Sequence, residues 1–147
     1  MTAAADILLQ KISSYPFRMT IMPRYADVDV FCQLSRRALA EYHEESRTRF
    51  MVQIFGEHFL DEKRDYRMLP VRVSYEYFQE ARYLHPLIAT AGVTQIGTSS
   101  FEITMALFQD EACVSLSRAT TVHVVNERAR PLTQAQKAHL LAQNMGA

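Results

Sequence analysis

Apolar and polar side chains alternate over three short stretches of the chain, and a period of two indicates a half-buried β-strand. Two further stretches are dense in valine, threonine and other residues that favour strands. The breaks between these stretches carry turn residues, as in His85-Pro86 and Gly97-Thr98-Ser99. The pattern predicts five strands, at about residues 17–22, 71–77, 87–96, 101–107 and 112–125.

The longest helical pattern lies between the first two strands. Small and apolar residues recur there at spacings of three and four, which suits a helix packed closely against a sheet. Ser35 is placed to cap the start of this helix, and Gly56 is a good stop signal. The face predicted to pack consists of Ala38, Leu39, Tyr42, Ser46, Phe50, Gln53 and Ile54.

The remaining segments are less regular. Residues 57–67 are charged and aperiodic, which predicts a mobile loop, and residues 3–12 fit either a short helix or a loose arm. Pro131 is expected to end the sheet, and Thr133 to cap a final helix over about residues 134–143.

The order of the elements is strand, long helix, then four strands. Two of the connections between the later strands are short, so those strands should pair as antiparallel neighbours. This order predicts an α+β fold with the helix on one face of an antiparallel sheet. One helix cannot cover every apolar position of five strands, so an apolar edge or face should be left for a second copy.

Composition narrows the function classes. A length of 147 residues fits one domain spanning residues 1–147, and a formal net charge of zero gives no general affinity for nucleic acid or anionic membranes. No apolar run reaches the ~18 residues of a membrane span, and the N-terminus lacks the pattern of a signal peptide. Cys32 and Cys113 do not make a disulfide framework, so a reducing cytoplasm is the expected location.

Candidate chemistry gathers just before the long helix. Asp27 and Asp29 lie there, and a carboxylate beside the free N–H groups of a helix start suits acyl chemistry. The same residues also serve as ordinary turn formers. Cys32, near the helix start, is either a rival nucleophile or a small apolar filler. The five histidines have no metal-ligand spacing, and neither a glycine-rich phosphate loop nor a Gly-x-Ser-x-Gly motif is present, so no metal or cofactor is expected.

The segment RYADVDVFCQLSRRALAEYHEESR resembles the hotdog-fold acyl-CoA thioesterases, specifically the 4-hydroxybenzoyl-CoA thioesterase-like superfamily. IGTSSFEITMAL is similar to a hairpin of that family, and TTVHVVNERARPL to its closing strand and proline. The resemblance covers about residues 17–132, and the core of the domain is expected at about residues 16–132. The matching positions in the first segment are Arg24, Tyr25, Asp27, Asp29, Tyr42, Glu44, Glu45 and Arg47.

The resemblance implies a hotdog fold, in which a five-stranded, mainly antiparallel sheet wraps a long central helix, with short terminal helices. It implies that Asp29 acts as nucleophile or general base, and that the backbone amide of about Arg36 binds the oxyanion. Where the family usually has Gly-His and Asn-Asn, this chain has Cys32-Gln33 and Ser35-Arg36, and these residues shape the pocket beside the acid. The residues expected at the substrate are Tyr25, Cys32, Gln33, Ser35, Arg37, Gly97, Thr98 and Ser99.

The implied activity is hydrolysis of an acyl-CoA thioester to a carboxylate and free CoA by a homodimer or dimer of dimers. A non-catalytic hotdog protein that binds an acyl ligand is the first alternative. A hydratase or dehydratase is the second, although those enzymes pair a catalytic histidine with the acid. The acyl group, its chain length and the choice between CoA and a carrier protein stay open.

Overall fold

The computed structural model describes residues 7–145. Residues 7–9 are helical, and the remainder of the predicted N-terminal helix before them lies outside the described residues. None of the helices in the described part is long and apolar enough to cross a membrane. The elements in order are η1 (Ile12–Ser14), β1 (Phe17–Ile21), η2 (Tyr25–Asp27), α2 (Arg36–Phe55), η3 (Glu57–Leu60), β2 (Arg67–Tyr77), β3 (Leu87–Ile96), β4 (Ser100–Gln109), β5 (Ala112–Val125), β6 (Arg128–Ala129) and α3 (Gln134–Leu141).

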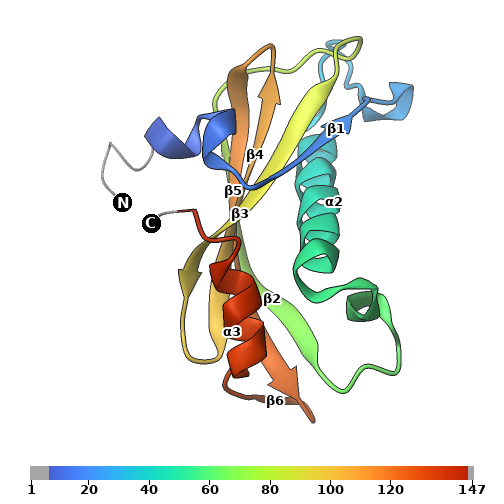
Figure 1. Ribbon diagram of the computed structural model, residues 1–147. Coiled ribbons are helices and arrows are strands. Elements are labelled where there is room, and N and C mark those ends of the chain that lie inside the picture. Colours follow the sequence, from blue (N-terminus) through green and yellow to red (C-terminus); the bar gives the residue numbers. More distant parts are fainter. Residues whose placement is uncertain (1–6, 146–147) are drawn as a thin grey trace.

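The strands form one antiparallel sheet in the order β1-β3-β4-β5-β2, with β6 paired to the end of β5. α2 lies lengthwise along one face of this sheet (Figure 1). The α+β hotdog prediction and its five strands are confirmed. The bounds of β1, β3, β4 and β5 agree with the prediction to within two residues, whereas β2 begins four residues earlier than predicted, at Arg67. The two-residue β6 was not predicted, because both its residues are exposed and carry no alternation.

α2 begins and ends where its sequence signals place it. The Ser35 side chain accepts a hydrogen bond from the Ala38 amide at 3.0 Å, and Gly56 ends the helix with a φ of +85°. The prediction that Gln53 packs is wrong, since it is exposed. His43 and Met51 are buried instead, because the helix also presents a face to β2 and β5.

Both faces of the sheet are covered in part by the chain itself. On the helix side, Phe17 packs on Phe50 with ring centroids 5.5 Å apart, and Leu140 of α3 completes the same core. On the other side, Leu9 and Tyr15 pack against β4 and β5. The N-terminal segment therefore takes up part of the apolar surface that the sequence assigned to a second copy. Among the described strand residues, the large apolar side chains that stay exposed at an edge of the sheet are Leu69 and Val71 of β2.

The predicted loop over residues 57–67 contains a short helix. η3 occupies its first part, and Phe59 is buried against the core. The charged residues around Phe59 hide this single apolar anchor in the sequence, because one buried position creates no periodicity.

A polar contact is buried between α2 and β5. The Ser115 hydroxyl donates to the Glu76 carbonyl at 2.9 Å, so its oxygen is free to accept from His43 Nε2, also at 2.9 Å. His43 Nδ1 is buried and has no partner among the described residues. Burial, assisted by the charge of Arg47, lowers the pKa of His43 to about 3.

This burial predicts acid sensitivity. The folded pKa of His43 lies below the unfolded value, so between about pH 6.5 and pH 3 the unfolded state binds the extra proton. The free energy of unfolding should therefore fall on acidification through this window, by up to about 1.4 kcal/mol per pH unit. Urea titrations of the wild type and of His43→Gln should show the slope flattened in the variant.

His58→Gln is the matched control, because the His58 side chain is 94% exposed. It should keep the wild-type slope. If His43→Gln and the wild type lose stability in parallel across this window, His43 is not the group that titrates.

Candidate functional site

Asp27 is the structural acid of the segment before α2. Its side chain is 1% exposed, and it accepts a hydrogen bond from the Tyr42 hydroxyl at 2.5 Å and from the Arg24 amide at 3.1 Å. Its carbonyl accepts from the Ser35 amide at 2.9 Å. Asp27 therefore holds the loop to α2 at two points: its side chain bonds to Tyr42 within the helix, and its backbone carbonyl bonds to Ser35 at the helix cap.

These contacts keep Asp27 ionised. Burial alone would raise the pKa of Asp27, but the hydrogen bonds from Tyr42 and Arg24 outweigh it, and the pKa lies below its usual value. Burial and the neighbouring Asp27 charge raise the pKa of Tyr42 in turn. A charged Asp27 is thus part of the fold, and its side chain is not available for chemistry.

Asp29 is held differently. It is half-buried, and one carboxylate oxygen, Oδ1, accepts from the amides of Phe31 at 2.8 Å and Gln33 at 3.1 Å. Its backbone is fixed as well, by bonds to the Gln33 carbonyl and from the Cys32 amide. Within the described residues the other oxygen, Oδ2, has no hydrogen-bond donor. The turn therefore orients one oxygen and leaves the second available to a ligand.

The first turn of α2 supplies free donors. Ser35 takes up two of the early amides, because its hydroxyl accepts from Ala38 and its carbonyl from Leu39, each at 3.0 Å. The amides of Arg36 and Arg37 precede these and have no intrahelical acceptor. They form the anion-favouring end of the helix dipole.

The side chains around the helix start point in different directions. The Arg36 guanidinium lies over the Tyr77 ring at 4.7 Å. Arg37 turns back, donating to Glu41 at 2.8 Å and to the Ala26 carbonyl at 3.4 Å. The Tyr25 ring is 80% exposed. Arg36 and Tyr25 are therefore open to a ligand, whereas the charge of Arg37 is already paired.

Cys32 and Gln33 lie at two of the positions where this sequence differs from the family that it resembles. Cys32 is exposed and has a φ of +61°, the left-handed conformation that favours glycine. Gln33 pairs with Arg82 through an isolated bridge, and its side-chain oxygen is buried with no partner among the described residues. The backbone here has the shape that a glycine would adopt, although the residue is a cysteine.

The hairpin of Gly97, Thr98 and Ser99 lies at the opposite end of the sheet. Asp29 follows β1, whose last residue pairs with Leu87 at the start of β3, while the hairpin follows the end of β3. Ten strand residues separate the two ends, about 30 Å. Within one chain the hairpin is not brought to Asp29.

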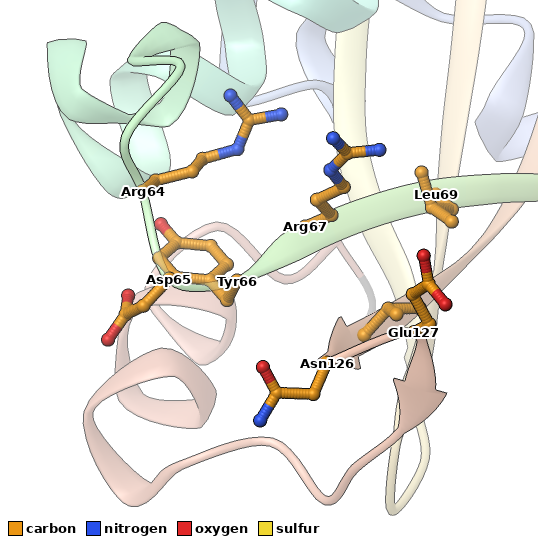
Figure 2. Close-up of a pocket in the computed structure, with 8 residues that line it drawn as sticks. Arg64, Asp65, Tyr66, Arg67, Leu69, Asn126 and Glu127 are labelled. Carbon is orange, nitrogen blue, oxygen red and sulfur yellow. The ribbon is translucent and has the colours of Figure 1, made fainter.

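A groove of about 490 Å³ opens at that same far end, where β2 begins. Figure 2 shows the Arg64 and Arg67 side chains extending to the same side of the chain, while Asp65 points away. The sequence pattern offered no reason to select these arginines, because they lie in the segment predicted to be a loop. Among the described residues no cluster of histidine, cysteine or acidic side chains is placed to hold a metal ion.

No family model and no curated protein matches the chain. Solved structures do match. A protein described as a predicted thioesterase from Bacillus stearothermophilus superposes with a TM-score of 0.81 and 20% identity, over 89% of this chain and 98% of that one. At this identity the likeness shows a shared fold.

Two further structures agree. A thioesterase from Thermus thermophilus, solved with coenzyme A and Zn, has a TM-score of 0.80 and 16% identity, over 90% of this chain and 96% of that one. A 1,4-dihydroxy-2-naphthoyl-CoA thioesterase from Synechocystis has a TM-score of 0.75 and 15% identity, over 85% and 95%. The hotdog fold is thus shared with proteins named as thioesterases.

The left-handed backbone at Cys32 predicts a stabilising substitution. Cys32→Gly should raise the free energy of unfolding by about 1 kcal/mol, because glycine adopts this φ without a Cβ clash. Cys32→Ala keeps the Cβ and is the matched control, which should gain nothing in urea titrations. Equal stability of the two variants would show that the turn is not strained.

Proposed function

We propose that this protein is an acyl-CoA thioesterase, which hydrolyses a thioester to a carboxylate and free CoA. The observation that carries the proposal is the pairing of an oriented carboxylate with free helix amides. Asp29 Oδ2 is left available by a turn that fixes Oδ1, and the amides of Arg36 and Arg37 follow at the start of α2.

Two alternative mechanisms of hydrolysis can use Asp29 and the helix amides. Asp29 either attacks the thioester carbonyl carbon itself or removes a proton from an attacking water. In both cases negative charge develops on the carbonyl oxygen, and the Arg36 and Arg37 amides would stabilise it. The carbon–sulfur bond then breaks, and CoA leaves as the thiolate. If Asp29 is the nucleophile, this leaves an acyl anhydride on Asp29, which a water molecule hydrolyses to the carboxylate and free Asp29. If Asp29 is the base, the attacking water gives the carboxylic acid directly.

The named structures support the choice of substrate class. One neighbour is a thioesterase solved with coenzyme A, and another is named for an aromatic acyl-CoA. In this chain, the exposed Tyr25 ring and the Arg36 guanidinium would line the approach to Asp29, and Arg36 would attract the CoA phosphates.

A second copy of the chain would complete the site. Among the described strands, β2 is an edge strand paired only to β5. Antiparallel pairing of two β2 strands about a two-fold axis would place the Arg67 end of one beside the Tyr77 end of the other. The groove with Arg64 and Arg67 would then lie near the Asp29 of the second copy.

The two alternatives make different demands. A binding protein would use the same groups around Asp29 without turnover, and the departures from the family at Cys32, Gln33, Ser35 and Arg36 favour it over the enzyme. A hydratase would need a histidine facing Asp29. Of the buried histidines, His43 bonds to Ser115, and His123 Nδ1 lies 3.0 Å from the Arg130 carbonyl.

Asp29→Asn tests the activity. The amide keeps the shape of the carboxylate but carries no anion, so kcat should fall by about 10²–10⁴-fold, the usual contribution of a positioned base. Release of free CoA from a panel of acyl-CoA esters, followed with a thiol reagent, measures it. Circular dichroism should show the variant folded.

Cys32→Ser is the control for the rival nucleophile and should retain most of the activity. Loss of turnover in Cys32→Ser, with Asp29→Asn active, would transfer the role to the thiol. A wild type that binds acyl-CoA but releases no thiol would favour the binding protein. Asp27→Asn is unsuitable as a control, because Asp27 is buried and hydrogen-bonded to Tyr42.

The dimer is tested at the β2 edge. Val71 is 62% exposed there, beside an irregularity in the β2–β5 pairing. Light scattering should give about twice the chain mass of 16.9 kDa at micromolar concentration. Val71→Lys should shift the protein toward monomer, because a lysine on an edge strand opposes pairing.

Leu84→Lys is the matched control, since Leu84 is 80% exposed but lies outside the strands. It should leave the mass unchanged. A wild-type monomer, or equal dissociation by both lysines, would contradict pairing through β2.

A further inference from the structure

A buried glutamine holds the connection between β2 and β3. Gln109, the last residue of β4, is 5% exposed. Its side-chain oxygen accepts from the Arg82 amide at 2.8 Å, and its side-chain nitrogen donates to the carbonyls of Arg82 at 2.9 Å and His85 at 3.1 Å. The Arg82 guanidinium also pairs with Asp110, the residue that follows Gln109. The end of β4 therefore fixes the position of this connection, residues 78–86.

The connection in turn supports the loop that carries Asp29. Arg82 forms an antiparallel bridge with Gln33, and the Ala81 carbonyl accepts from the Leu34 amide at 2.9 Å. The Gln33 amide donates to Asp29 Oδ1 at 3.1 Å, and its carbonyl accepts from the Asp29 amide at 2.8 Å. Hydrogen bonds and backbone pairing thus form a continuous path from Arg82 through Gln33 to the candidate acid.

The two loops are packed together as well as hydrogen-bonded. Ala81 is 0% exposed and Leu34 is 3% exposed, and both belong to one apolar cluster. Phe31, whose amide also donates to Asp29 Oδ1, is 79% exposed, so its side chain gives the turn no anchor in the core. Because protein interiors are close-packed, a displacement of the β2–β3 connection should move the Asp29 turn with it.

We propose that Gln109 is a positioning residue for the Asp29 carboxylate. A reacting group has to be held within about 0.5 Å of its productive geometry, and a displacement of about 1 Å can cost about 10²-fold in rate. Gln109 does not touch Asp29, and it acts through Arg82 and Gln33. The kinetic consequence rests on the proposed hydrolysis, whereas the orientation of Asp29 is measured without any thioester.

Gln109→Met tests that orientation in ¹H–¹⁵N correlation spectra of the full-length protein. Methionine has a similar length but no N–H to donate, so the connection loses its bonds to β4. The Gln33 amide proton should shift toward the position it takes in Asp29→Ala, where its carboxylate acceptor is absent. Hydrogen exchange of the Leu34 amide should become about ten-fold faster, because the hydrogen bond that protects it is loosened.

Gln136→Met is the matched control. Gln136 is also a buried glutamine, 9% exposed, whose side-chain oxygen accepts from a backbone amide, that of Thr133 at 2.9 Å. It lies in α3 and contacts His123, which is near the end of β5 that lies away from the β4–β5 turn. It should leave the amides of the Asp29 turn as they are in the wild type.

Turnover provides the second measurement. Gln109→Met should lower kcat about 10–100-fold and change KM little, because the aim of the acid matters in the transition state. Gln136→Met should keep the wild-type kcat even if it loses as much stability in urea. Gln109→Asn keeps the amide but is one methylene shorter, so it should fall between the wild type and Gln109→Met. It serves as the second variant if Gln109→Met fails to fold.

Three results would overturn the proposal. They are wild-type signals for Gln33 and Leu34 in a folded Gln109 variant, equal shifts in Gln109→Met and Gln136→Met, and wild-type kcat in Gln109→Met. A wild type that releases no thiol would contradict the proposed hydrolysis instead. In that case the Gln33 and Leu34 signals still decide whether Gln109 orients Asp29.

Discussion

The buried hydrogen bond between Asp27 and Tyr42 is the constraint on which the candidate site depends. Asp27 lies in a short helical turn and Tyr42 lies in the second turn of α2, so the bond fixes the connection between them. Asp29 is only two residues further on and inherits that position. A buried carboxylate would cost free energy if it were unpaired, and the Arg24 and Tyr42 donors offset that cost. The two aspartates thus have different roles. Asp27 fixes the loop, and the loop in turn positions the Asp29 carboxylate.

The residues proposed for the site lie in two separate groups on a single chain. The acid and the free helix amides lie at one end of the sheet, whereas the glycine hairpin and the groove with two arginines lie at the other. Antiparallel sheets place consecutive turns at alternate ends, so no local adjustment could unite them. The halves can meet only between two copies that run in opposite directions. The unpaired edge of β2 is the element that would permit this arrangement.

The face of α2 toward β5 is unusually polar for the interior of a small protein. His43 and Arg47 lie one turn apart on it, and Ser117 and Thr121 face them from β5, each with a buried atom that has no partner in the described part of the chain. Such groups destabilise a fold unless water or a ligand satisfies them. Buried polar atoms without a partner in the described part of the chain therefore mark this side of the helix. That property distinguishes this side of the helix from the apolar side around Phe50.

The fold class, most strand positions and the two ends of α2 could be predicted from the amino-acid order. These follow from signals carried by adjacent residues, such as the alternation in β4, the cap at Ser35 and the left-handed Gly56. Long-range packing set the rest. It separated the roles of Asp27 and Asp29, which look alike as turn residues, because only Asp27 meets a tyrosine fifteen residues away. It also buried His43, which the helical spacing had not selected, and left Gln53 exposed. The reason is that His43 contacts Ser115 of β5 and Tyr75 of β2, on a side of the helix that the spacing did not predict to be covered. Whether a side chain is buried, and which partner it meets, depend on which strands become neighbours. The order of the strands in the sheet is a property of the whole chain.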